Sequence, residues 1–130
     1  MPVDFTPAEM KVLLLYDFNP QWTTQEKEEV SEAHARLTGH LSSVGFRTDL
    51  LPVVDHHFPE NLTSFDSDAC VLFNWCDGIP GHKHSEWIVA RHLEQRRFVF
   101  TGSSSATLAL SYEKHRVKEI LDRHGVATPR

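Results

Sequence analysis

Polar and glycine residues follow three apolar segments at points where a small molecule could bind. Asp17 to Asn19 end the run KVLLLYD, the loop DGIPG (Asp77 to Gly81) follows ACVLFNW, and TGSSS (Thr101 to Ser105) follows RFVF. If these segments are parallel strands, ligands collect where their carboxyl ends meet. We therefore take the following residues as candidates for substrate binding: Asp17, Asn19, Asp77, Gly78 and Ser103.

The stretch TGSSS has two interpretations. It combines a glycine, several hydroxyl groups and the expected start of a helix, whose free N–H groups favour an anion. It is also typical of an ordinary strand-to-helix turn in which a serine caps the helix, and spacing alone favours this second interpretation. The sequence contains neither the full phosphate-binding Walker pattern nor GxGxxG, and DGIPG can also be a plain glycine and proline turn.

Nine histidines raise the question of a metal site. His56 and His57 are adjacent, and His82 and His84 are two residues apart, but no HExxH and no zinc-type Cys/His spacing occurs. We therefore expect no metal and solvated histidines. Cys70 and Cys76 would lie about 20 Å apart along an extended chain, too far for a disulfide.

Four apolar segments are expected to form strands, and helical patterns separate them. The segments cover residues 11–17, 46–54, 69–75 and 97–102, and Pro52 places the second at or near a sheet edge. A long helix begins at a Thr23 and Glu26 capping box and ends at Gly45. Shorter helices are expected at 85–94, 103–110 and 112–124. The alternation predicts an α/β fold: a three-layer α/β/α sandwich with a mainly parallel, Rossmann-like sheet of four strands or slightly more.

The long helix and the last helix each have a recognisable apolar face. In the first, the face consists of Val30, Ala33, Leu37, Leu41 and Val44. In the last helix it consists of Val117, Ile120 and Leu121, while Lys114 and Lys118 share another face at a spacing of four. Such lysines are ordinarily solvated, so spacing alone leaves open whether Lys114 has a function.

Length and charge exclude several classes of protein. A chain of 130 residues fits one domain, and a net charge of -5 is the wrong sign for a nucleic-acid binder. Uninterrupted apolar runs such as Val12 to Leu15 are far shorter than the ~20 residues of a membrane span. The N-terminus does not have the pattern of a signal peptide. We expect a cytoplasmic protein with no nucleic-acid or membrane partner.

Residues 69 to 129, read together, resemble the first domain of ATP-grasp ligases, most closely the D-alanine:D-alanine ligase group. The matching features are VLFNWCDGIPG, then Glu86, then FVFTGSSSATLALSYEKHRVKEILDRHGVATP. In that family a strand ends in an Asn- and Gly-containing loop, and a TGS turn precedes an Asp-Lys pair. A Gly-Val-x-Thr-Pro linker then follows. The resemblance implies that Asp77 and Gly78 face an amino-acid substrate and that Lys114 contacts ATP.

The same resemblance implies how the chain and its parent protein are divided into domains. Residues 1–10 would be an N-terminal arm, 11–124 the α/β domain, and 125–130 the start of a linker. Central and C-terminal ATP-grasp domains would follow in the parent and bind ATP and magnesium, so this part alone would be inactive and need no cofactor. A small amino-acid-like substrate and a homodimer are also implied.

The sequence departs from the family pattern in ways that leave the product open. Asp77 replaces His or Glu, Glu113 replaces the usual Asp, and DFNPQW stands in place of a glycine-rich loop. Lys27 falls where a substrate-binding Glu is usual. A phospho-receiver or another non-enzymatic α/β interaction module is the alternative, although Asp17 stands alone where receivers cluster acidic residues.

Overall fold

The fold is built around a four-stranded parallel sheet. The computed structural model describes residue 6 and residues 9–129; the rest of the expected N-terminal arm and Arg130 lie outside the described residues. The strand order is β2-β1-β3-β4. The strands are β1 (Lys11–Asp17), β2 (Arg47–Val53), β3 (Cys70–Trp75) and β4 (Val99–Phe100). The first three match the predicted segments closely, and Pro52 does lie in an edge strand.

Strand β4 is shorter than the predicted segment 97–102. Arg97 has φ of 62°, a left-handed conformation that belongs to a turn rather than to a strand. The backbone therefore becomes extended only after the turn, and β4 pairs with β3 through the two positions Val71–Val99 and Leu72–Phe100.

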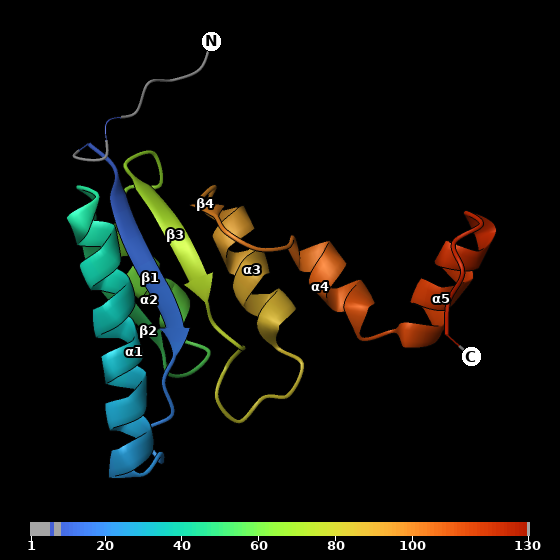
Figure 1. The fold of residues 1–130 in the computed structure, drawn as a ribbon, viewed down its shortest axis with the longest axis horizontal. Coiled ribbons are helices and arrows are strands. Elements are labelled where there is room, and N and C mark those ends of the chain that lie inside the picture. The colour runs from blue at the N-terminus through green and yellow to red at the C-terminus, as the bar shows by residue number, and fades with distance from the viewer. Residues whose placement is uncertain (1–5, 7–8, 130) are drawn as a thin grey trace.

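Helices cover the sheet on both faces, which confirms the α/β/α arrangement (Figure 1). Helix α1 lies on one face, and α2 and α3 lie on the other. The helical segments are α1 (Thr24–Ser43), α2 (Phe58–Asn61), the 3-10 turn η1 (Leu62–Ser64), α3 (Glu86–Gln95), α4 (Ser105–Ser111) and α5 (Lys114–Arg123). In the described part of the chain, none of the helices has the length and apolar character needed to cross a membrane.

Helix α1 begins and ends where its sequence signals predicted. The backbone N–H of Thr23 donates to Glu26 Oε2 at 2.8 Å, and the backbone N–H of Glu26 donates to Thr23 Oγ1 at 3.2 Å. This reciprocal pair satisfies two N–H groups that the first turn leaves free. At the other end Gly45 adopts φ of 97° and donates to the Ser42 carbonyl oxygen, which ends the helix.

The main core lies between the sheet and helices α2 and α3. The parallel register places Leu13 beside Leu72 and Leu15 beside Leu51. The following residues are buried together with them: Val53, Phe58, Leu62, Cys70, Ile79, Val89, Leu93 and Phe98. Fully burying one such side chain contributes roughly 1.5–3 kcal/mol, so this layer is the principal source of stability.

The opposite face of the sheet is covered less completely. Val12 and Leu14 of β1 are buried, but Trp75 at the end of β3 is 45% exposed and Val99 of β4 is 64% exposed. The coverage of both sheet faces that an α/β/α sandwich implies therefore holds for β1 and not for the β3–β4 half. Val44, expected on the apolar face of α1, is also exposed because it follows the last helical turn.

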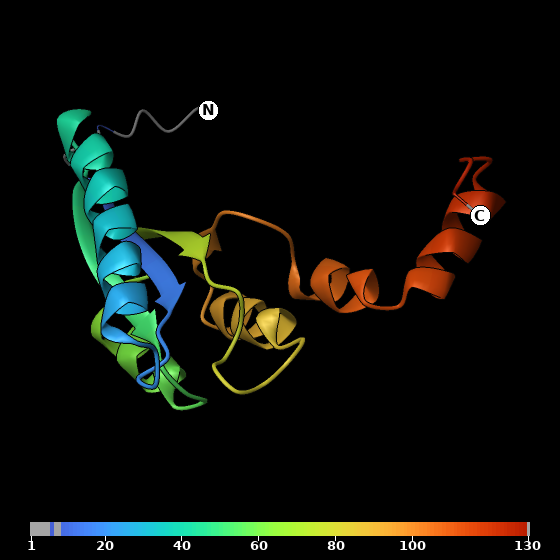
Figure 2. The same ribbon diagram turned by 60° about the horizontal axis from the view of Figure 1, so that its bottom comes forward.

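Helices α4 and α5 form an arm that leads away from the sheet (Figure 2). Helix α4 lies against α3, and α5 lies beyond α4. No residue of either helix is buried. The arm thus contributes little to the core that holds the strands.

Candidate functional site

The carboxyl ends of β1 and β3 form the centre of the candidate site. Helix α1 leaves β1 on one face of the sheet, whereas the chain leaves β3 toward α3 on the other face. This divergence of neighbouring loops creates a crevice at which open parallel sheets bind ligands. Asp17 Oδ1 accepts a hydrogen bond from the backbone N–H of Asp77 at 3.0 Å, which joins the two loops.

A small pocket of about 250 Å³ opens beside this contact, between α1 and the sheet. Two of the predicted residues, Asp17 and Asp77, lie in its wall. The remaining lining consists of Tyr16, Trp22, Val30, Ala33, His34 and Trp75. The two carboxylates were predicted because they follow predicted strands, whereas the aromatic residues of the pocket were not predicted from the sequence.

His34 is the most buried residue of this pocket, with 6% of its surface exposed. Its ring lies 3.9 Å from the ring of Tyr16, measured between centroids, and meets the Trp75 ring edge-on at 5.7 Å. Burial lowers the pKa of His34, and the nearby carboxylate of Asp17 partly offsets that effect. Solvated histidines were expected, and for His34 that expectation is wrong. Its spacing from Val30 and Leu37 places it on the helical face that packs on the sheet, a signal that the sequence contains.

The site carries negative charge without a matching positive charge. The pKa of Asp77 is raised, first by burial and then by the carboxylates of Asp17 and Glu86. Among the described residues, none of these three carboxylates forms an ion pair. In the same part of the chain, Asn74 Oδ1 and Glu86 Oε2 are buried without a hydrogen-bond donor. The carboxyl end of β3 is therefore rich in acceptors and poor in donors.

Cys76, the first residue after β3, stays protonated at neutral pH. Burial raises the pKa of its thiol to about 12, and the carboxylates of Asp17, Asp77 and Glu86 add to the effect. The thiol donates to the Gly78 carbonyl oxygen at 3.3 Å. Cys70 and Cys76 are both free thiols, and Cys70 is buried.

Gly78 shapes the loop that carries Asp77. Its φ is 117°, and a Cβ atom at this position would lie 2.6 Å from Ser85 Oγ. That hydroxyl is held by two hydrogen bonds: it accepts from the Ile79 backbone N–H at 2.7 Å and donates to the His82 carbonyl oxygen at 2.6 Å. Gly78 is buried, so it supports the site by letting Ser85 close the loop.

Asn19 lies in a neighbouring hollow of about 350 Å³ formed by the loops after β1, β2 and β3. Pro80 and Gly81 come from the third loop and Asp55 from the second. Asn19 Oδ1 accepts from the backbone N–H of Gln21 at 2.9 Å, which stabilises the turn before α1. Asn19 therefore lies near the loops of Asp17 and Asp77, as expected from the meeting of the carboxyl ends of parallel strands.

At TGSSS the structure favours the capping interpretation. Ser104 is the N-cap of α4 and accepts from the backbone N–H of Thr107 at 3.2 Å. Glu94 of α3 accepts from the Ser105 backbone N–H at 2.7 Å and from its hydroxyl at 2.6 Å. A carboxylate of the chain itself thus occupies the position considered for an anion, and these hydrogen bonds lower the pKa of Glu94. Ser103 is exposed just before this turn.

Lys114 lies apart from the other candidates, at the start of α5. It lines an apolar groove of about 480 Å³ along α4 and α5, together with Leu110, Val117 and Pro129. The neighbouring Lys118 donates from Nζ to the Pro129 carbonyl oxygen at 2.8 Å, which holds the last residues against the helix. The structure therefore places Lys114 on the arm, away from the Asp17–Asp77 pocket (Figure 1).

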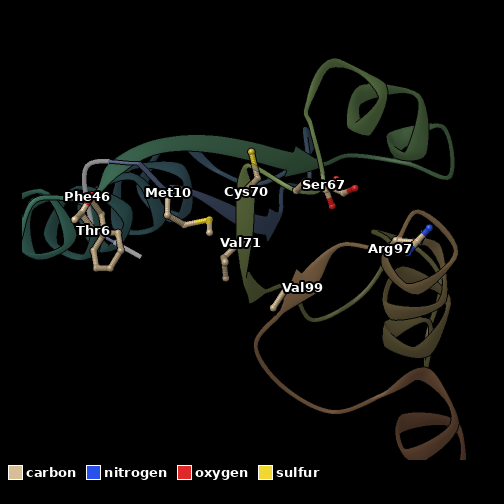
Figure 3. A pocket seen from close by; sticks show the side chains of 9 residues that line it. Thr6, Met10, Phe46, Ser67, Cys70, Val71, Arg97 and Val99 are labelled. Carbon is tan, nitrogen blue, oxygen red and sulfur yellow. The ribbon is translucent and has the colours of Figure 1, made fainter. Parts of the chain in front are cut away.

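A further hollow of about 370 Å³ lies at the opposite, amino end of the strands (Figure 3). Met10, Val71 and Val99 project into the same space, so its surface is mainly apolar. It contains none of the predicted site residues. In residues 9–129 together with Thr6, no three His, Cys, Asp or Glu side chains are grouped so that they could hold a metal ion.

Comparison of the chain with protein-family models, with curated proteins and with solved structures finds no match.

Proposed function

We propose that this chain is the substrate-side domain of an ATP-dependent carboxylate–amine ligase of the D-alanine:D-alanine ligase type. The observation that carries the proposal is the pairing of Asp17 with Asp77 at the β1/β3 crevice of a parallel α/β domain. The TGS turn and Lys114 follow this crevice in the order that the resemblance implies. Catalysis would require the central and C-terminal ATP-grasp domains of a parent protein.

The reaction needs two kinds of charge stabilisation. ATP first phosphorylates the carboxylate of one substrate, giving an acyl phosphate and ADP; the amine of the second substrate then displaces inorganic phosphate. Positive side chains and magnesium must stabilise the phosphoryl group as it moves. Asp17 and Asp77 suit the amine-bearing end of a substrate, and Lys114 suits the phosphates.

The residues of this chain fit only one wall of a nucleotide site. Lys114 and Lys118 lie beside apolar side chains, Lys118 already donates to the Pro129 carbonyl oxygen, and the described residues provide no cluster for magnesium. On this proposal the magnesium ligands and the remaining phosphate contacts belong to the later domains. ATP and magnesium supply the phosphoryl transfer chemistry there, while this chain binds and orients the substrate.

The arm supports a docking role within such a parent. Val117, Ile120 and Leu121 form the expected apolar stripe of α5, yet none of them is buried. A short helix in water gains most of its stability from packing an apolar face. A further domain that covers this stripe would also bring its own residues next to Lys114.

The test uses a protein that contains this chain together with ATP-grasp domains. Phosphate release is measured with magnesium, ATP and pairs of small amino or hydroxy acids. We expect Lys114→Ala to raise KM for ATP about tenfold or more, because it removes one charge-assisted contact worth about 1.5–3 kcal/mol. The control Lys83→Ala changes an exposed lysine of the β3–α3 loop and should leave KM unchanged.

Two results would contradict the proposal. An unchanged KM in Lys114→Ala would remove this residue from the nucleotide site. An absence of phosphate release with every acid and amine pair would argue against a ligase. In addition, calorimetric titration of the present chain with magnesium ATP should show negligible binding, and micromolar affinity would mean that the domain does not depend on partners for its nucleotide.

A further inference from the structure

We infer that Tyr112 fixes the start of α5, and with it Lys114, relative to the loop between β3 and α3. Tyr112 is a positioning residue in this inference, because it would act on a bound nucleotide through Lys114. The contacts of Tyr112 with the loop do not depend on any ligase chemistry. Only the role given to Lys114 rests on the proposed function, so the two can fail separately.

Tyr112 lies at the bend between the two helices of the arm. It is the C-cap of α4, and the next residue, Glu113, is the N-cap of α5 with φ of -90° and ψ of 65°. These angles are not helical, so the chain changes direction at Glu113 before Lys114 begins α5. The Glu113 N–H donates to the Leu110 carbonyl oxygen at 2.9 Å, which supports the bend. Because α5 has no buried residue, the side chains at the bend decide its direction.

The ring of Tyr112 packs on His84 of the β3–α3 loop. The two ring centroids are 4.3 Å apart, and the ring planes are tilted by 58°. His84 has φ of 58°, a left-handed conformation that is unfavourable for a residue other than glycine. Strain of this kind persists only where the surrounding contacts hold the residue in place. The ring of Tyr112 supplies one such contact, so the arm and the loop meet at a strained residue.

The hydroxyl of Tyr112 faces Glu86, the first residue of α3. Hydrogen bonding between these two side chains is the largest cause that raises the pKa of Tyr112 to about 12, followed by burial and by the negative charges of Glu86 and Asp77. The influence of Asp77 places the hydroxyl on the side of the domain where β3 ends. Tyr112 therefore connects the loop that carries Asp77 with the helix that begins at Lys114.

Helix α4 is attached to the domain at its first turn as well. Glu94 of α3 accepts from the Ser105 backbone N–H at 2.7 Å and from its hydroxyl at 2.6 Å. Ser105 and Tyr112 thus tie both ends of α4 to the domain, whereas α5 contacts α4 and extends away from the sheet (Figure 1). Loss of the Tyr112 side chain should leave α4 attached at its start and release the first turn of α5, where Lys114 lies.

A variant with a single tyrosine reports on the contact with Glu86. The chain has two tyrosines, so in Tyr16→Phe the ultraviolet absorbance of ionised tyrosine follows Tyr112 alone. At pH 10 a free tyrosine is about half ionised, whereas Tyr112, with a pKa of about 12, should be only about 1% ionised. Glu86→Gln should raise the ionised fraction at least about threefold, and Glu119→Gln, the same change on exposed α5, should leave it unchanged. Circular dichroism at pH 10 shows whether each variant is folded.

Hydrogen exchange measured by NMR tests whether Tyr112 holds the start of α5. The Val117 N–H donates to the Glu113 carbonyl oxygen at 3.0 Å, so its exchange rate reports on the first turn. Tyr112→Ala should increase this rate at least about threefold, although alanine is the better helix former. Tyr112→Phe keeps the ring on His84 and should restore most of the protection. His115→Ala, which removes an exposed ring of α5, should not increase the rate, and the amides of β1 should be unaffected in all three variants.

Kinetics of a parent that contains ATP-grasp domains separate positioning from a general loss of stability. Tyr112→Ala should raise KM for ATP about threefold or more while kcat changes little, and Tyr112→Phe should restore KM. In a Lys114→Ala background the Tyr112→Ala change should add almost nothing, because a positioning residue has no effect once the residue that it positions is absent.

Three results would overturn the inference. They are an unchanged exchange rate of Val117 in folded Tyr112→Ala, ionisation of about half of Tyr112 at pH 10, and effects of Tyr112→Ala and Lys114→Ala on KM that simply multiply. A parent that releases no phosphate would refute the proposed function instead. The exchange and absorbance measurements would then still decide whether Tyr112 fixes the start of α5.

Discussion

Replacing Gly78 by alanine tests the reasoning about the β3–α3 loop most directly. The new Cβ atom would lie 2.6 Å from Ser85 Oγ, closer than real Cβ contacts come. Ser85 cannot move freely, because its buried hydroxyl joins the Ile79 N–H to the His82 carbonyl group. The φ of 117° adds strain for any side chain. Strain of about 1–3 kcal/mol, plus the weakening of one or two hydrogen bonds at about 1 kcal/mol each, gives an expected destabilisation of roughly 2–4 kcal/mol.

The assay is urea denaturation followed by tryptophan fluorescence and circular dichroism, with the free energy of unfolding obtained by linear extrapolation. Gly81→Ala is the matched control: Gly81 also has a positive φ, 81°, but an added Cβ would meet nothing within 4 Å. It should cost only the backbone strain, about 1–2 kcal/mol. The excess loss in Gly78→Ala measures the contact with Ser85.

A double-mutant cycle separates the two causes. Ser85→Ala alone should destabilise the chain by about 1–3 kcal/mol, because the buried Ile79 N–H loses its acceptor. Once the hydroxyl is absent, the Gly78→Ala change should cost less than it does alone, so the double variant should be more stable than the sum of the single effects predicts. If Gly78→Ala costs no more than Gly81→Ala, or if the two changes are additive, the explanation given for this glycine is refuted.

Three further predictions concern local contacts. Thr23→Ala removes the capping box of α1 and should lower the free energy of unfolding by about 1 kcal/mol, whereas Thr24→Ala should have a smaller effect; urea denaturation measures both. Glu94 has a lowered folded pKa, so the stability it contributes by binding Ser105 should be present above its ordinary pKa of 4.5 and be lost as the pH falls through the folded value. Glu94→Gln should flatten that acid-side decline in melting temperature, and an unchanged slope would contradict the assignment. Cys76, with a pKa of about 12, should react with iodoacetamide at pH 7 at least about a hundredfold more slowly than a free thiol, as followed by mass spectrometry; a rate like that of glutathione would mean that the thiol is not buried as described.

The sheet and the long helix could be predicted because their signals are local. Lys11–Asp17 contains an uninterrupted apolar run, and the Thr23 capping box and Gly45 mark the ends of α1 within a few residues. The short β4 could not be predicted, since the conformation of Arg97 depends on how α3 meets the sheet. The periodicity of apolar residues predicts individual helices and strands, but it does not predict which other element packs against each residue.

The candidate site could be predicted in part. Asp17 and Asp77 could be predicted because each follows a predicted strand, and the carboxyl ends of parallel strands lie together in every fold of this class. Trp75 and His34 belong to the same pocket but look like core residues in the sequence. Whether such residues are covered or left beside a cavity depends on packing between α1 and the sheet, which a single sequence does not specify.

The loose attachment of α5 has a consequence for how the domain responds to heat and to binding. The strands and α3 share one buried layer and should open together, with the full free energy of global unfolding, whereas α5 has no buried residue to tie it to that cooperative unit. Its backbone amides should therefore exchange with solvent long before those of β1. If another domain packed against α5 and stabilised it, the free energy of unfolding of the sheet would stay almost unchanged. The sheet and α5 would then behave as thermodynamically separate parts of one chain.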